Sequence, residues 1–281
     1  MHYPFGLSPM TYTYARYSLE YTLSAAEKHG FFEIEIWGGH PHAAVELLDE
    51  GYLKKLTDLL AKYKLTVSMF TPEQLAAPVS IGSHDPHIKD YSVRHFCRAV
   101  DAAAVMGAPR MLMTSGTVLA DEDPKKAWDR AMDSLTHIAR YGMERGVKIV
   151  LEPLAKEESP LLNSLPTLEK AYQELSPFRP EVMVDLVPMH LNQERLEDYF
   201  TVFGQDLSVI HFIDCDGKTI KHLIPGDGVI DFTSIMETIK ARNFKGSVSL
   251  ELGDSYHENP DQALVKSLEK VKQLALEVGY Q

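Results

Sequence analysis

Short apolar runs alternate along this chain with longer segments whose apolar residues recur every three or four positions. The short runs have the length of strands and are rich in β-branched and aromatic residues. They lie at residues 5–8, 32–37, 65–70, 110–114, 148–152, 181–185, 207–214 and 247–251. The longer segments have the spacing of amphipathic helices and lie at residues 19–29, 52–63, 90–106, 124–145, 165–175, 193–203, 232–241 and 260–274. The pattern therefore predicts eight strand-then-helix pairs in succession.

This alternation restricts the fold. A strand followed by a helix returns to a parallel sheet by a right-handed crossover, and eight such units close the sheet into a barrel. Glycines suited to helix C-caps, at Gly30, Gly107 and Gly146, fall between a predicted helix and the next strand. An open doubly wound sheet is the alternative, but no G-x-G-x-x-G loop follows the first predicted strand. We therefore predict an α/β fold, a single (β/α)8 TIM barrel that forms one domain over residues 1–281.

Length and composition suit one globular protein in a reducing compartment. The chain has 281 residues, of which 44% are hydrophobic, enough for one barrel with a large core. Its net charge of −12 disfavours nucleic acid as a partner, because the phosphate backbone would be repelled. Two cysteines, Cys97 and Cys215, are too few for a disulfide framework. With no signal-peptide pattern after Met1 and no long apolar stretch, we expect a cytoplasmic protein with no membrane partner.

Four predicted strands in the second half of the chain end in residues that bind metals, namely Glu152, Asp185, His211 and Glu251. The C-terminal ends of barrel strands face one mouth, so these side chains are expected to converge there. Three carboxylates and one imidazole suit a divalent ion, with Mn²⁺ favoured and Mg²⁺, Co²⁺, Ni²⁺ or Zn²⁺ as alternatives. An acidic residue at a strand end can instead simply cap the following helix. Four residues able to bind a metal, at the ends of four successive strands, favour the metal site over four separate helix caps.

Glu152 and Glu251 are expected to act on opposite faces of one substrate. They end the fifth and eighth strands, which face each other across a barrel more nearly than neighbouring strands do. One carboxylate would remove a proton from a carbon, and the other would return a proton to the opposite face, which inverts the stereocentre. A divalent metal on the adjacent oxygens would acidify that proton and stabilise the enediolate. Such a reaction needs no further cofactor.

Several segments carry a resemblance to a known family. They are Ile-Glu-Ile-Trp-Gly-Gly at 34–39, Leu-Glu-Pro-Leu at 151–154 with Glu158, Met-Val-Asp at 183–185, His-Phe-Ile-Asp at 211–214, Ile-Pro-Gly-Asp-Gly at 224–228 and Leu-Glu-Leu at 250–252. Together they resemble the xylose-isomerase-like barrel superfamily and, within it, the ketose 3-epimerases, above all the fructoselysine 3-epimerase group. The resemblance spans nearly the whole chain and implies a TIM barrel with sugar isomerase chemistry.

The resemblance also implies a role for each matching residue. Glu152 and Glu251 would be metal ligands and, in addition, the acid/base pair. Asp185 and His211 would be ligands only. Glu158 would hydrogen-bond around the catalytic carboxylate and the substrate.

Other residues near the predicted mouth are expected to contact the sugar. Asp214 belongs to an Asp-x-Asp-Gly segment that points to the fructoselysine group. Hexulose epimerases of the tagatose type have a histidine three residues after the metal aspartate and an arginine six after the metal histidine. This chain has Pro188 and Gly217 at those positions. His190 and either Lys218 or His222 lie nearby and are the expected substitutes, which makes free hexuloses the less favoured substrates.

Three loops on the strand-to-helix side carry weaker signals. Trp37 is expected to form an apolar wall of the substrate pocket, and a zinc site at His40 and His42 is the less favoured interpretation because no third ligand is near in sequence. The loop at 71–89 is a candidate lid whose role the sequence leaves open. Segment 224–228 resembles the phosphate-binding region of many barrels, so a phosphosugar stays an alternative substrate.

The sequence therefore predicts an isomerase, a metal-dependent carbohydrate 3-epimerase that acts on a ketose or a fructosamine such as fructoselysine. The main alternative is an aldose–ketose isomerase or epimerase of sugars or sugar phosphates at the same site. More distant alternatives are a DNA-repair enzyme like the AP endonucleases, which the acidic charge disfavours, and a non-catalytic sugar-binding barrel. The expected partners are a small sugar or sugar-amine substrate and further copies of the chain in a homo-oligomer.

Overall fold

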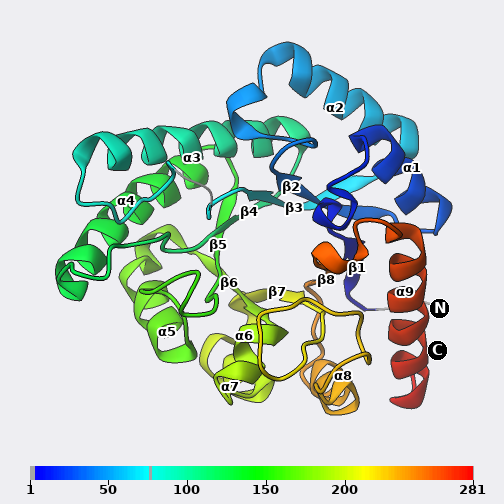
Figure 1. Ribbon diagram of the computed structural model, residues 1–281. Coiled ribbons are helices and arrows are strands. Elements are labelled where there is room, and N and C mark those ends of the chain that lie inside the picture. The colour runs from blue at the N-terminus through cyan, green and yellow to red at the C-terminus, as the bar shows by residue number, and fades with distance from the viewer. Residues whose placement is uncertain (1–3, 76–77, 281) are drawn as a thin grey trace.

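Eight parallel strands form the centre of the molecule in the computed structural model, which describes residues 4–75 and 78–280. The strands are β1 (Gly6–Pro9), β2 (Glu33–Gly38), β3 (Thr66–Pro72), β4 (Arg110–Met113), β5 (Lys148–Leu151), β6 (Glu181–Asp185), β7 (Leu207–His211) and β8 (Ser247–Leu250). Their order in the sheet is β1-β8-β7-β6-β5-β4-β3-β2. Neighbours in sequence are thus neighbours in space, as in a barrel (Figure 1). The predicted TIM barrel is confirmed.

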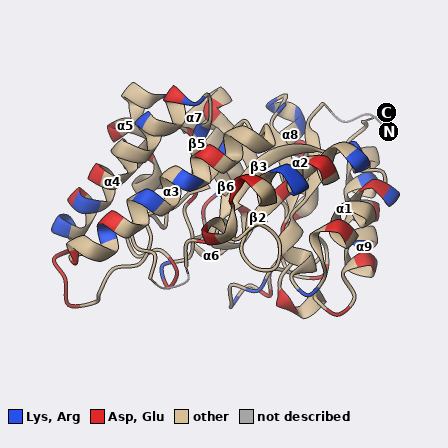
Figure 2. Ribbon diagram, turned by 90° about the horizontal axis from the view of Figure 1, so that it is seen from above, with Lys and Arg blue, Asp and Glu red and all other residues tan. Residues whose placement is uncertain are grey.

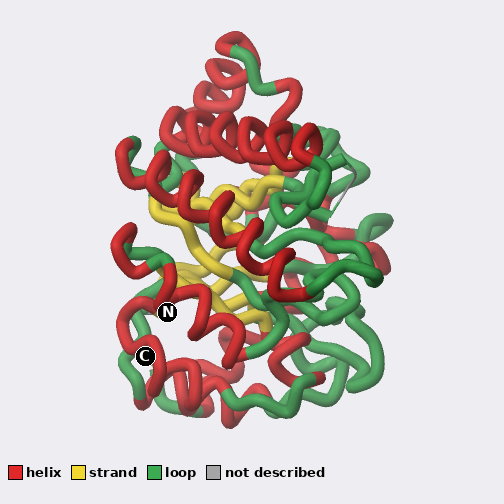
Figure 3. Tube along the Cα trace, turned by 90° about the vertical axis from the view of Figure 1, so that its left-hand side faces the viewer, coloured by secondary structure: helices red, strands yellow, loops and turns green. Residues whose placement is uncertain are grey.

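Helices surround the strands. They are α1 (Leu19–Lys28), α2 (Glu50–Tyr63), α3 (Pro86–Met106), α4 (Pro124–Glu144), α5 (Leu165–Glu174), α6 (Leu186–Leu191), α7 (Leu196–Phe203), α8 (Phe232–Ala241) and α9 (Pro260–Glu277). Local sequence fixes their starts, because the carboxylates of Asp49, Asp85 and Asp123 accept hydrogen bonds from backbone N–H groups in the first turns. The loops that follow the strands gather at one end of the barrel (Figure 3).

The barrel closes at the seam between β1 and β2, the two end strands of the sheet order, with little strand pairing. The two strands are joined by one isolated parallel bridge between Met10 and Glu35. The Trp37 backbone N–H also donates to the Thr11 hydroxyl at 2.8 Å across the same seam. The barrel is therefore nearly closed, and Glu35 lies at the point of closure.

A layer of apolar side chains fills the barrel beneath its C-terminal mouth. Its members come from five consecutive strands and are almost fully buried: Met69, Leu112, Val150, Met183 and Val209. Side chains two residues apart on a strand share a face, so this layer supports the next inward positions. Burial of each such side chain contributes about 1.5–3 kcal/mol. The C-terminal mouth therefore lies above a packed layer of apolar side chains.

Two elements differ from the predictions. β7 ends at His211, whereas the apolar run predicts a strand to residue 214, because the chain turns there and Asp214 pairs instead with Leu223 in an antiparallel bridge. Helix α6 was not predicted, since its six residues are too few to show helical periodicity. It begins directly after Asp185, whose carboxylate accepts from the Val187 backbone N–H at 2.8 Å.

Charges of both signs are mixed along the outer faces of α3 and α4 (Figure 2). Such mixing is typical of a solvated surface, whereas a groove that binds a charged partner such as nucleic acid carries charges of one sign. Within residues 4–75 and 78–280, none of the helices has the length and apolar content needed to cross a membrane.

A candidate metal centre at the barrel mouth

The four strand-end residues predicted as ligands come together at the C-terminal mouth. Glu152 directly follows β5, Asp185 ends β6, His211 ends β7 and Glu251 directly follows β8. One potential ligand atom each from Glu152, Asp185 and His211 lies within 4.8 Å of the others. The Nδ1 atom of His211 is 2.9 Å from Oε2 of Glu251 and 3.4 Å from Oε1 of Glu152. The histidine thus faces both glutamates.

Three of these atoms are buried and have no hydrogen-bond partner among the described residues. They are Oε1 of Glu152, Oδ2 of Asp185 and Nδ1 of His211. A buried polar atom without a hydrogen bond costs about 1–3 kcal/mol, so three in one place require an explanation. A divalent cation provides one, because carboxylate oxygens and an imidazole nitrogen are its usual ligands. The residues present therefore fit a metal ion.

The electrostatics of the cluster support the same interpretation. Burial raises the pKa of Glu152 to about 8, and the charges of Glu251 and Asp185 act in the same direction against His211. Burial also raises the pKa of Asp185. Although burial alone would lower it, the pKa of His211 is raised well above its usual value by Glu35, Glu251 and Glu152. The chain has gathered more negative charge than it compensates, and a cation would remove this imbalance.

His222, predicted as a substrate contact, lies beside two residues of the cluster. Its Nε2 is 3.7 Å from Oδ2 of Asp185, and its Nδ1 is 3.5 Å from Oε2 of Glu251. Asp185, His222 and Glu251 form a second group whose potential ligand atoms lie within 4.8 Å of one another. Although burial opposes it, the pKa of His222 is raised by the charges of Glu251 and Asp185. His222 is therefore a candidate ligand, in addition to its predicted contact with the sugar.

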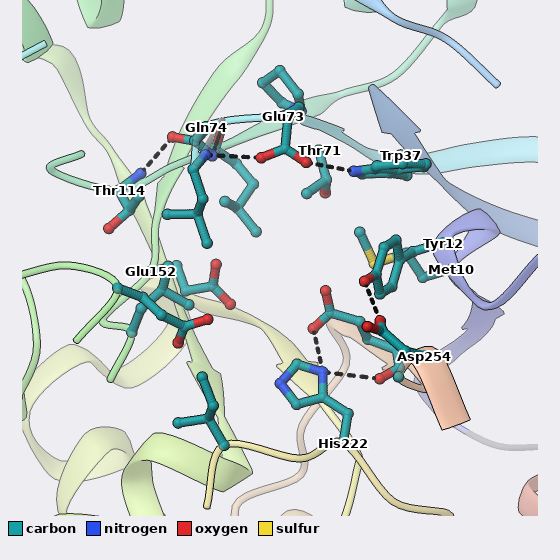
Figure 4. A pocket seen from close by; sticks show the side chains of 18 of the residues that line it. Met10, Tyr12, Trp37, Thr71, Glu73, Gln74, Thr114, Glu152, His222 and Asp254 are labelled. Atoms are coloured by element: carbon teal, nitrogen blue, oxygen red, sulfur yellow. Dashed lines mark hydrogen bonds and ion pairs between the residues drawn. The ribbon is translucent and has the colours of Figure 1, made fainter. Parts of the chain in front are cut away.

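A cavity of about 670 Å³ opens above the cluster. Figure 4 shows its walls, where Trp37 and Tyr12 stand on one side and Glu152 on the other. The Trp37 indole N–H donates to Glu73 at 3.3 Å, and the Tyr12 hydroxyl donates to Asp254 at 2.5 Å. The volume of the cavity lies in the range of about 300–1,000 Å³ that is typical of small-molecule sites.

Glu158 also lines this cavity. Burial, reinforced by the charge of Asp185, raises the pKa of its carboxyl to about 7. Glu152 lines the same cavity, and the role of Glu158 around the catalytic carboxylate and the substrate stays a prediction.

Asp214 and His190, predicted as substrate contacts, are not among the described residues that line the cavity. Asp214 is completely buried, and its carboxylate accepts from the backbone N–H groups of Cys215, Gly226, Gly228 and Ile230 at 2.8–3.0 Å. This aspartate therefore organises the loop after β7, which carries His222. His190 lies in the last turn of α6 and is half-buried.

Sequence reasoning did not single out several residues of the site. Tyr12 and Asp254 come from the short 3₁₀ turns Thr11–Tyr14 and Asp254–Tyr256, which leave no periodic signal. Glu35 lies inside the apolar run at 32–37, where the sequence does not show which residue it contacts. The structure pairs it with His211, whose Nε2 lies 3.2 Å from Oε2 of Glu35. The one available signal was a glutamate inside an apolar strand.

An eight-stranded α/β barrel with a carboxylate–histidine cluster at its C-terminal mouth has the arrangement of one class of protein, the barrel enzymes, because such barrels carry their active sites at that end. Within that class, the profile of the xylose isomerase-like TIM barrel family matches residues 23–274. The chain belongs to this family.

Relatives of known activity narrow the class of chemistry. The fructoselysine 3-epimerase of Shigella flexneri is 28% identical to the chain over 92% of this chain and 94% of that protein. A D-psicose 3-epimerase from Clostridium cellulolyticum H10, solved with D-tagatose, superposes with a TM-score of 0.81 at 17% identity, covering 96% of this chain and 99% of that one. The predicted isomerase class agrees with these names.

A further solved structure bears on the metal. The IOLI protein, determined with a bound zinc atom, has a TM-score of 0.83 at 17% identity and covers 99% of this chain and 100% of its own. At this identity the likeness shows a shared fold, and it establishes that the same fold can hold a divalent ion in another protein.

Proposed function

We propose that this protein is a divalent-metal-dependent epimerase that inverts C3 of a ketose or a fructosamine. The observation that carries the proposal is the convergence of three buried ligand atoms, one each from Glu152, Asp185 and His211. None of them has a partner in hydrogen-bond geometry among the described residues. This group lies beside Glu251, whose carboxylate approaches His211 Nδ1 at 2.9 Å. Glu152, Asp185, His211 and Glu251 would hold the ion, Mn²⁺ in our preferred assignment, and His222 is a candidate additional ligand.

The chain's own contribution to the reaction is a pair of carboxylates that exchange protons with carbon. Glu152 and Glu251 project from β5 and β8, which are separated in the sheet by β6 and β7, so they approach a bound sugar from different sides. One removes the C3 proton, and the other delivers a proton to the opposite face of the same carbon. When bound, the divalent ion would polarise the neighbouring carbonyl and acidify that proton.

The charges in the cavity support a neutral or amine-bearing sugar over a phosphosugar. Five carboxylates line it, from Glu73, Glu152, Glu158, Glu251 and Asp254. Its only basic lining side chains, among the residues described, are Lys221 and His222. A phosphate dianion would be repelled there, whereas an ammonium group would be attracted to carboxylates and aromatic faces.

Two carboxylates of the wall would be the partners of such an ammonium group. Glu73 and Asp254 each hydrogen-bond to an aromatic neighbour, Trp37 and Tyr12. The two aromatic rings pack edge to face with centroids 5.0 Å apart. This acidic, aromatic wall supports a fructosamine such as fructoselysine as the substrate, since fructosamines carry an amine on the sugar.

Solvent-isotope labelling tests the proposal directly. The purified protein is incubated in deuterated water with Mn²⁺ and, separately, with fructose, fructoselysine and fructose 6-phosphate. NMR then locates the deuterium in the recovered sugars. We expect deuterium at C3 together with the C3 epimer, and the highest kcat/KM for fructoselysine.

Other labelling patterns would contradict the proposal. Deuterium only at C1 or C2 would indicate an aldose–ketose isomerase. Unlabelled sugar after long incubation with metal would indicate a non-catalytic sugar-binding barrel. A preference for the phosphosugar would overturn our assignment of the acidic cavity wall.

A further inference from the structure

The carboxylate of Glu35 lies behind the candidate metal centre, on the far side of the His211 ring. Its Oε1 and Oε2 atoms are 3.3 and 3.2 Å from Nε2 of His211. The Thr71 hydroxyl donates to Oε1 of Glu35 at 2.5 Å. Both side chains of the Glu35–His211 pair are almost completely buried. The contact is therefore shielded from water and from competing partners.

The two nitrogens of His211 face different surroundings. Nε2 faces Glu35, whereas Nδ1 faces Glu152 and Glu251 in the cluster. Nδ1 lies 2.9 Å from Oε2 of Glu251, inside the candidate ligand cluster, so a bound cation would take its lone pair together with the carboxylates of that cluster. Glu35 is then the acceptor left for the one proton of the neutral ring, at Nε2. Glu35 thus supports the orientation and the tautomer in which His211 can bind a cation.

The backbone holds Glu35 in place from both sides. Its strand, β2, has an irregular register with β3 between Ile34 and Glu35, so that Glu35 pairs with Met69 and Ser68 is skipped. On its other side, Glu35 forms the bridge to Met10 that closes the barrel. Bulges of this kind change the direction of a side chain and occur often beside active sites. The position of the carboxylate is therefore built into the sheet.

From this geometry we propose that Glu35, supported by Thr71, is a positioning residue that orients His211 and strengthens the binding of a divalent cation at the barrel mouth. The inference rests on the metal site of the proposed function and does not depend on the identity of the sugar. A carboxylate on the second nitrogen of a ligand histidine fixes the ring and raises its basicity, and removal of such a partner typically weakens metal binding about 10–100-fold.

Metal binding without sugar tests this role. Isothermal titration of the metal-free protein with Mn²⁺ gives the affinity, and the visible absorption spectrum of the Co²⁺-loaded protein reports the ligand geometry. For Glu35→Gln we expect a dissociation constant about 10–100-fold higher and a changed Co²⁺ spectrum. For Thr71→Val, which removes only the hydrogen bond to Glu35, we expect a change in the same direction and of smaller size.

Glu181→Gln is the matched control. Glu181 is another buried glutamate on a barrel strand, but it pairs with Arg110 and Lys148 at 2.5–2.6 Å instead of with a candidate ligand. This variant should lower the thermal stability and leave the Mn²⁺ affinity and the Co²⁺ spectrum unchanged. A purely structural role for Glu35 would make the two glutamine variants behave alike.

The outcomes separate this inference from the proposed function. If the wild-type protein binds neither Mn²⁺ nor Co²⁺, the metal centre itself fails. If the wild type binds them and Glu35→Gln binds them equally well with the same spectrum, the positioning role of Glu35 is overturned while the metal centre stands. Should Glu35→Gln not fold, Thr71→Val decides, and wild-type affinity and spectrum in that variant would reject the proposal.

Discussion

The two ends of this barrel bury the same kind of residue in opposite ways. At the N-terminal end, the Glu181 carboxylate is 8% exposed and pairs with Arg110 at 2.6 Å and Lys148 at 2.5 Å. At the C-terminal mouth, Glu152 is buried to a similar extent beside Asp185 and Glu251. One carboxylate is compensated by the chain, and the other lies in an excess of negative charge.

The pKa values express this difference. Burial acts to raise the pKa of both groups, but at Glu181 it is outweighed by Lys148 and Arg110, so that pKa is lowered. At Glu152 burial prevails and raises the pKa to about 8. The charge of Glu181 is compensated by two basic side chains of the chain itself. Glu152 shares His211 with Glu251, so its environment favours a further cation or a proton. From this comparison we expect the carboxylate at the N-terminal end, Glu181, to contribute to stability and the carboxylates of the C-terminal mouth to contribute to activity.

The largest expected effect is the loss of activity on changing Glu152→Gln. Glutamine keeps the shape of the side chain but can neither transfer a proton nor bind a cation with full charge. We expect kcat to fall about 10²–10⁴-fold, the range typical of a lost general acid or base, with the fold retained. Steady-state kinetics with the sugar that the labelling experiment selects would measure this. Near-normal turnover would remove Glu152 from the reaction.

A smaller effect is the stabilisation of the protein by a divalent metal. A ligand that binds only the folded state at 100 times its dissociation constant adds about 2.7 kcal/mol to the free energy of unfolding. For a chain of 281 residues that corresponds to a rise in Tm of about 5 °C. Differential scanning calorimetry with and without Mn²⁺ measures the shift. Asp185→Asn should abolish most of it, and an equal shift in that variant would contradict the assigned ligand set.

How much of this comparison the sequence could predict depends on the distance over which each signal acts. The convergence of Glu152, Asp185, His211 and Glu251 at the mouth could be predicted because each lies at the end of an apolar run, and barrel topology brings the ends of such runs together. Periodicity likewise predicted the eight strands. Local sequence patterns were therefore sufficient to predict those residues that the repeated strand–helix topology of the barrel brings together.

The remaining parts of the site depend on contacts that no local pattern encodes. The pairing of Glu35 with His211 spans 176 positions and depends on a register shift in the sheet. The contact of Tyr12 with Asp254 spans 242 positions and joins two short turns. Asp214 was predicted as a substrate contact because its Asp-x-Asp-Gly segment resembles the fructoselysine group, yet its carboxylate is occupied by backbone N–H groups.

The other end of the barrel should respond in stability instead of activity. Glu181→Gln leaves Arg110 and Lys148 without their carboxylate, and hydrogen bonds to charged groups contribute about 1.5–3 kcal/mol each. Because Lys148 is half-exposed and Arg110 is one quarter exposed, we expect a loss of about 1–3 kcal/mol in total. Urea unfolding measures the loss, and kinetics should show an unchanged kcat. A large fall in kcat with intact stability would erase the distinction between the two ends.

The smallest expected effect is a pH dependence of stability that belongs to the mouth alone. Burial raises the pKa of Glu152 to about 8 and that of Glu158 to about 7, from 4.5 when unfolded. Between about pH 6.5 and 8, the folded protein therefore binds more protons at these groups than the unfolded chain does. The free energy of unfolding then falls as pH rises.

Over this interval the expected loss in the metal-free protein is about 1–2 kcal/mol, since one proton corresponds to about 1.4 kcal/mol per pH unit. Histidines with lowered pKa values, such as His42 at about 4, are partly protonated in the unfolded chain near pH 6.5, so they offset part of this loss there and little of it above about pH 7.5. Urea unfolding at several pH values tests the slope, which Glu152→Gln should reduce and Glu181→Gln should leave unchanged. Saturating Mn²⁺ should cancel or reverse it, because the ion binds the deprotonated ligands and its binding releases protons. A metal-free protein whose stability stays constant or rises over this interval would show that the mouth carboxylates are already compensated, and the contrast between the two ends would be lost.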